Sequence, residues 1–88
     1  MYKPKNTKER ILHRLKISQG HLKKVIKMVE DGEYCVDVIH QSKALQKALK
    51  ETDNVILADH LNTCATKAIR AGKEKKAIAE IMGIVSKT

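Results

Sequence analysis

The stretch from Cys35 to Ala71 contains neither proline nor glycine, and this restricts the possible folds more than any other feature of the sequence. At 1.5 Å of rise per residue it forms a helix roughly 50 Å long, which the rest of one short chain cannot cover. Long helices of this kind usually pack antiparallel against a copy of themselves, so we expect a dimer. The weakest point of the helix is Thr52-Asp53-Asn54, where low helix propensity makes a break most plausible. One face is apolar at helical spacing, through Val38, Leu45, Leu49, Ile56, Leu61, Ala65, Ala68 and Ile69.

Two shorter helices are expected on either side of the long one. The segment Asn6-Thr7-Lys8-Glu9 has the form of a capping box, with Asn6 or Thr7 as the cap, and opens a helix over about residues 8–30. Gly32 is the natural left-handed residue to end that helix. Apolar spacing predicts a third helix over residues 74–85. We therefore expect an all-α fold, a three-helix protomer with one long central helix, in a single domain over residues 1–88.

The chain has little material for a deep core of its own. Its 88 residues include no Trp, no Phe and only two Tyr, so Ile, Leu, Val, Ala and Met supply the apolar content. Amphipathic faces of this composition bury well between helices, but an isolated protomer keeps an uncovered stripe. A partner copy would cover the stripe, which again predicts an oligomer.

Positive charge is concentrated near the N-terminus. The net charge is +8, and residues 1–28 contain nine Lys or Arg against one acidic residue, Glu9. A basic segment on a neutral remainder predicts a polyanionic partner, DNA or RNA first, although a solvated lysine-rich face would have the same composition. We find neither a membrane-length apolar stretch nor the apolar run of a signal peptide, so we expect a cytoplasmic protein without a membrane partner.

His60 and Cys64 are the first candidates for chemistry. Their spacing of four residues places both side chains on one helical face, where they can bind one metal ion. The alternative is a solvated His beside a Cys that acts as a small apolar side chain. Two cysteines in a cytoplasmic chain are more often ligands or redox-active thiols than a structural disulfide.

Cys35 is the third candidate, because the first turn of a helix favours the thiolate that a soft metal requires. It lies twenty-five residues before His60, about 37 Å along a straight helix, so the two cannot meet within one chain. An antiparallel dimer brings Cys35 of one subunit beside His60 and Cys64 of the other. Two thiolates and one imidazole form a soft, three-coordinate set that suits copper(I) better than zinc.

Three motifs in this sequence together resemble the copper-sensitive operon repressor (CsoR) family, which also contains nickel/cobalt, formaldehyde and persulfide sensors. The resemblance covers nearly the whole chain, and the combined spacing is far more specific than any single motif. The motifs are Arg14-Leu15-Lys16-Ile17-Ser18-Gln19-Gly20-His21-Leu22, Tyr34-Cys35-Val36-Asp37-Val38-Ile39-His40-Gln41 and Asp59-His60-Leu61-Asn62-Thr63-Cys64.

The resemblance implies antiparallel dimers, each forming a four-helix bundle, that assemble into a disc-shaped homotetramer. Such a tetramer represses a copper-efflux operon until copper(I) loosens its hold on operator DNA. The family's copper ligands fall on Cys35, His60 and Cys64, and the residues that orient the imidazole fall on Tyr34 and Glu80. Its DNA-binding region of the first helix falls on Arg10, Arg14 and Lys16.

Some positions depart from the family pattern. Gln46 stands where many members have an Arg, so Lys43 and Lys47 are expected to rebuild part of the DNA surface. Persulfide sensors share both cysteines but lack the His, which makes a thiol-responsive repressor the closest alternative. A cytosolic copper-buffering protein is a further one. An enzyme is not expected, because the sequence has no nucleophile and base pair, carboxylate pair or phosphate-binding glycine loop.

Overall fold

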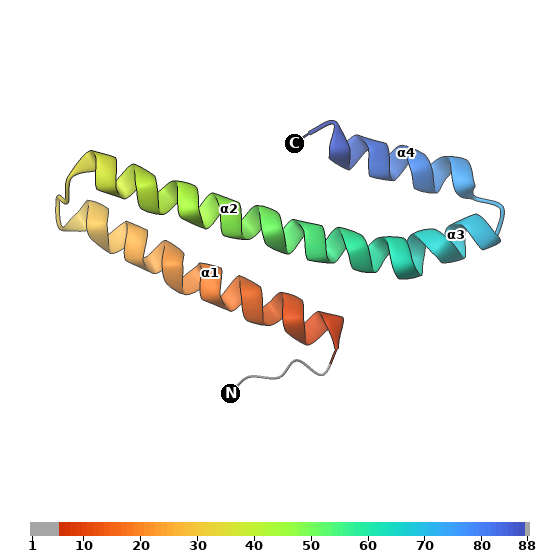
Figure 1. Cartoon of the computed structure of the whole chain (residues 1–88), viewed down its shortest axis with the longest axis horizontal. Coiled ribbons are helices and arrows are strands. Elements are labelled where there is room, and N and C mark those ends of the chain that lie inside the picture. The colour runs from red at the N-terminus through yellow and green to blue at the C-terminus, as the bar shows by residue number, and fades with distance from the viewer. Residues whose placement is uncertain (1–5, 88) are drawn as a thin grey trace. The chain divides into compact units, whose positions relative to one another are not determined.

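The computed structural model describes residues 6–87, and these residues form helices joined by short turns, with no strand among them (Figure 1). The all-α prediction is therefore confirmed. Tyr2, Lys3 and Lys5, which entered the composition and charge arguments, lie outside the described residues. The elements are α1 (Thr7–Glu30), α2 (Cys35–His60), the π-helical turn η1 (Leu61–Ala65), α3 (Thr66–Arg70) and α4 (Glu74–Val85).

The ends of α1 follow from local hydrogen bonds. The side chain of Asn6 accepts a hydrogen bond from the backbone N–H of Glu9 at 2.8 Å, so Asn6 rather than Thr7 is the cap. At the other end, Gly32 adopts a φ of 67°, and the N–H of Glu33 reaches back to the carbonyl of Met28 at 3.0 Å. These are the positions at which the sequence predicted the helix to start and stop.

Gly→Ala substitutions at two positions are expected to change stability in opposite directions. Gly32→Ala should lower the free energy of unfolding by about 1 kcal/mol, because alanine at a positive φ is strained. Gly20→Ala lies inside α1 with open space around the added Cβ, and should raise it by up to about 1 kcal/mol. Urea unfolding of the two variants beside the parent chain measures both shifts, and a Gly32→Ala chain that is as stable as the parent or more stable would contradict this account of Gly32.

The helices divide into two compact units, residues 1–56 and 57–88, of which the first contains α1 and most of α2. Within it, α1 and α2 run antiparallel (Figure 1), and the His21 Nε2 and Gln41 Oε1 atoms form a hydrogen bond of 3.0 Å between them. Thr52 is 2% exposed, yet its hydroxyl is satisfied because it donates to the carbonyl of Ala48 at 3.1 Å. The helix therefore continues through Thr52-Asp53-Asn54, and the break considered there does not occur.

The second unit contains the end of α2, η1, α3 and α4. Gly72, with a φ of 79°, provides the turn between α3 and α4. Ala65 and Ala77 are the buried side chains here, at 2% and 3% exposure. Because both are small, η1 and α4 can approach closely, and this approach brings the C-terminal helix beside His60 and Cys64.

Large apolar side chains remain exposed on both units. Few apolar side chains of residues 6–87 are buried, and the exposed ones recur along the helices: Leu12, Leu15, Ile17, Leu22, Ile26, Val29, Val36, Ile39, Leu49, Ile56, Leu61, Ile69, Ile78, Met82 and Ile84. This is the uncovered stripe that the composition predicted for an isolated protomer. None of the helices in residues 6–87 combines the length and the apolar character needed to cross a membrane.

Candidate functional site

The helical segment that carries His60 and Cys64 is not regular. His60 is the last residue of α2, and Cys64 lies within η1, a turn in which the backbone pairs over five residues instead of four. The sequence predicted an uninterrupted α-helix here, and that detail was wrong, although the chain stays helical from Cys35 to Arg70. Single π turns inside α-helices are frequent at functional sites, and this one begins directly after His60 and contains Cys64.

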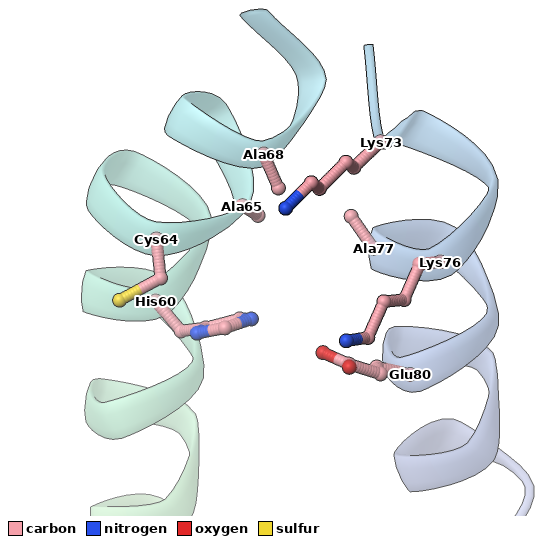
Figure 2. A pocket seen from close by; sticks show the side chains of 8 residues that line it. All are labelled: His60, Cys64, Ala65, Ala68, Lys73, Lys76, Ala77 and Glu80. Atoms are coloured by element: carbon pink, nitrogen blue, oxygen red, sulfur yellow. The ribbon is translucent and has the colours of Figure 1, made fainter. Parts of the chain in front are cut away.

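A cavity of about 190 Å³ opens between η1 and α4 (Figure 2). Alanines form much of its wall, so the space results from small side chains where two helices approach. The polar groups come from both sides: the imidazole of His60 faces two ammonium groups and a carboxylate on the α4 side, and Cys64 lines the cavity beside it. The lining residues are His60, Cys64, Ala65, Ala68, Lys73, Lys76, Ala77 and Glu80.

The imidazole of His60 and the carboxylate of Glu80 point toward one another across the cavity, as Figure 2 shows. The sulfur of Cys64 points away from α4, on the other side of its helix. The Thr63 hydroxyl lies 3.7 Å from that sulfur and 2.8 Å from the carbonyl oxygen of Asp59. The Thr63 hydroxyl has one proton, so it donates to only one of these two acceptors at a time.

Cys35 and Tyr34 belong to the other unit. Cys35 is the first residue of α2, and the carbonyl of Tyr34 accepts hydrogen bonds from the N–H groups of Asp37 and Val38. Both cysteines are free and exposed. Within residues 6–87 of one chain, no three His, Cys, Asp or Glu side chains gather as a metal-binding group. The structure thus brings together His60, Cys64 and Glu80 but leaves Cys35 and Tyr34 outside their cavity.

The available donors fit a soft metal. Two free thiols and an imidazole are the ligand types that copper(I) prefers, and neither sulfur is held in a disulfide. Sequence reasoning missed Lys73 and Lys76 on the cavity wall. The signal for them was present, because residues 73, 76, 77 and 80 share the i, i+3, i+4, i+7 spacing of one helical face.

The basic residues proposed for DNA lie on the first unit. Arg10, Lys16, Lys43 and Lys47 are exposed, and Arg14 is partly buried. Within residues 6–87, none of the five forms an ion pair, and the salt bridge present in α1 joins Lys27 to Asp31 at 3.3 Å. Their positive charge is therefore available to a polyanion.

Comparisons with known proteins agree with this picture. A family model described as metal-sensitive transcriptional repressor matches residues 7–87. The copper-sensing transcriptional repressor CsoR of Mycobacterium ulcerans (strain Agy99) is 41% identical over 81 residues, which are 92% of this chain and 69% of that protein. The protein of the same name from Bacillus subtilis (strain 168) is 35% identical over 86 residues, covering 98% and 85%.

A solved structure is similar as well. The crystal structure of the copper-sensing repressor CsoR with Cu(I) from Geobacillus thermodenitrificans NG80-2 matches with a TM-score of 0.86 and 37% identity, over 99% of this chain and 91% of that one. The matched family and relatives are transcriptional repressors and not enzymes, in agreement with the sequence analysis. On the match over residues 7–87 and the similarity to these repressors, the chain belongs to the metal-sensitive transcriptional repressor family, and its resemblance to CsoR is confirmed.

Proposed function

We propose that this chain is a copper(I)-responsive transcriptional repressor that binds operator DNA without metal and releases it when copper(I) binds, which derepresses copper-efflux genes. The whole chain acts as one regulatory domain in the cytoplasm. The observation that carries the proposal is that His60, Cys64 and Glu80 line one cavity. The other cysteine, Cys35, is a free thiol at the start of α2. The similar proteins described as copper-sensing repressors support it.

The metal site is shared between subunits of an antiparallel dimer, and two dimers form a tetramer. The absence of a three-ligand group within residues 6–87 of one chain supports sharing, because His60 and Cys64 alone make a weak site. The exposed apolar residues of α1, α2 and α4 support association, since a stable interface requires such a surface to be covered. Cys35 of one subunit then completes the ligand pair of the other.

Each residue at the site has a separate task. Cys35 and Cys64 supply soft thiolates, and His60 supplies the third ligand. The carboxylate of Glu80 points at the imidazole, so it can hold the ring in one orientation and one tautomer, and Tyr34 of the neighbouring subunit assists from the start of α2. With copper(I) bound, Cys35 of one subunit would be held beside His60 and Cys64 of the other, and the arrangement of the basic surfaces on α1 and α2 would change with them.

The decisive measurement is a titration of fluorescently labelled operator DNA under anaerobic conditions, with and without one equivalent of copper(I) per subunit. A coupling of about 2 to 3 kcal/mol predicts a loss of DNA affinity of roughly 30- to 150-fold on copper binding. Zinc(II) serves as the metal control and should have a much smaller effect, because it prefers a fourth ligand. Equal DNA affinities in the presence and absence of copper(I) would remove the proposal.

A further inference from the structure

The hydroxyl of Thr66 makes a hydrogen bond that a regular α-helix does not offer. It donates to the carbonyl oxygen of Leu61, five residues earlier, at 2.7 Å. Threonines inside α-helices bond the carbonyl three or four residues earlier. Thr52, in the regular part of α2, follows that rule with a bond to the carbonyl of Ala48. The Thr66 bond therefore selects the π register over the α register.

The turn that this bond closes depends on such support. A π turn is rare and occurs as a single turn within an α-helix, because the α register normally has the lower energy. Widening the turn displaces the carbonyls from their usual partners, and a side-chain donor can satisfy one of them. Thr66 is partly buried and directly follows the turn, so its hydroxyl is well placed for this task.

The register of this turn determines how the candidate ligands are oriented. His60 precedes the turn, Cys64 lies inside it, and the buried Ala65 ends it. Each residue in an α-helix turns the chain by about 100°, and a π turn advances the chain by a smaller angle per residue, so the register changes the angle between His60 and Cys64 about the helix axis. In Figure 2 the imidazole of His60 points toward α4, whereas the sulfur of Cys64 points away from it.

We propose that Thr66 is a positioning residue for the metal site: its hydroxyl holds the turn in the π register and thereby sets the orientation of Cys64 relative to His60 that copper(I) binding uses. Thr66 does not contact the metal. The inference rests on the proposed copper function, but the register of the turn can be measured without metal.

The test of affinity uses competition for copper(I) with a chromophoric chelator. Thr66→Val keeps the shape of the side chain and removes the hydroxyl, and it should bind copper(I) about fivefold or more weakly, as expected for the loss of one hydrogen bond. Thr66→Ser keeps the hydroxyl and should remain within about twofold of the parent. Thr52→Val removes a hydroxyl from the ordinary α register and is the matched control, with unchanged affinity expected.

The test of register uses NMR of the metal-free parent chain. Backbone contacts between Leu61 and Thr66 at five-residue spacing are expected, and they should shift to four-residue spacing in Thr66→Val. Parent-like copper(I) affinity in Thr66→Val, failure of Thr66→Ser to restore it, or an α register in the parent would each overturn the inference. If the parent chain binds no copper(I), the proposed function and the positioning role of Thr66 both fail. If the parent binds copper(I) tightly and only Thr66→Val binds it weakly, the result supports the proposed function and the positioning role. Because the register is read in the parent, a Thr66→Val chain that does not fold still leaves the inference open to refutation.

Discussion

Mixing two inactive variants is expected to restore copper(I) binding. Cys35→Ser and Cys64→Ser each remove one of three ligands from every site, and each alone should bind copper(I) at least about a hundredfold more weakly than the parent, because even residues that only support ligands cost up to that much. A dimer containing one subunit of each variant keeps one complete site, made of Cys35 from one chain and His60 and Cys64 from the other. The second site of that dimer loses both cysteines. Tandem purification of differently tagged subunits followed by chelator competition measures the recovery.

The control is a mixed dimer in which both subunits carry Cys64→Ser and differ only in their tags. It should bind as weakly as either variant alone, since no combination of its chains completes a site. Recovery to about one tight site per mixed dimer supports ligand sharing between subunits. Failure of the Cys35→Ser and Cys64→Ser mixture to recover, in dimers shown to contain both chains, would falsify the shared site.

Replacing His60 separates copper sensing from thiol sensing when copper(I) binding and the release of DNA are both measured. Both thiols are free and exposed, as a persulfide sensor also requires. His60→Ala should lose tight copper(I) binding and the copper-dependent release of DNA, whereas a thiol switch built on Cys35 and Cys64 would continue to respond to persulfide. A His60→Ala chain that still releases DNA with copper(I) would contradict the assignment of the imidazole as a ligand.

The helix ends could be predicted because their signals are local. The Asn6 cap and the left-handed Gly32 each depend on a few neighbouring residues, and the structure places them where the sequence predicted. The expected weak point at Thr52 shows that helix propensity alone does not predict where a helix breaks. Its hydroxyl donates a hydrogen bond to the carbonyl of Ala48 inside the helix, and burial of the side chain compensates for the low helix propensity of threonine.

The candidate site was harder to predict than the fold. The spacing of His60 and Cys64 identified a pair of ligands, but the π turn that follows His60 and contains Cys64 reflects a small energy difference between two backbone registers that residue types alone do not reveal. The lining by Lys73 and Lys76 depends on how closely α4 approaches, which the small Ala65 and Ala77 permit. The position of Cys35 relative to the other ligands is a property of the assembly, so one chain does not determine it.

Removing positive charge from α1 is expected to weaken DNA binding strongly and to reduce its dependence on salt. Arg10 and Arg14 are one helical turn apart, and neither forms an ion pair within residues 6–87. Each phosphate contact contributes about one unit to the slope of log affinity against log salt, which corresponds to about fivefold in affinity near physiological salt. The double variant Arg10→Gln/Arg14→Gln should lose both contacts in every subunit that touches DNA, so its affinity should fall more than about tenfold and its slope by about two per subunit.

The control for this experiment must remove charge without touching the basic surface. Lys75→Gln/Lys87→Gln lowers the net charge by the same amount from exposed positions in and beyond α4. If the protein recognises phosphates through α1, the control should keep the salt slope of the parent, and Lys43→Gln/Lys47→Gln on α2 should lower it as Arg10→Gln/Arg14→Gln does. Equal losses of DNA affinity in the α1 variant and the control variant would contradict this assignment. They would mean that affinity depends only on the net charge of the protein, because a localised interface is sensitive to some cations and not to others.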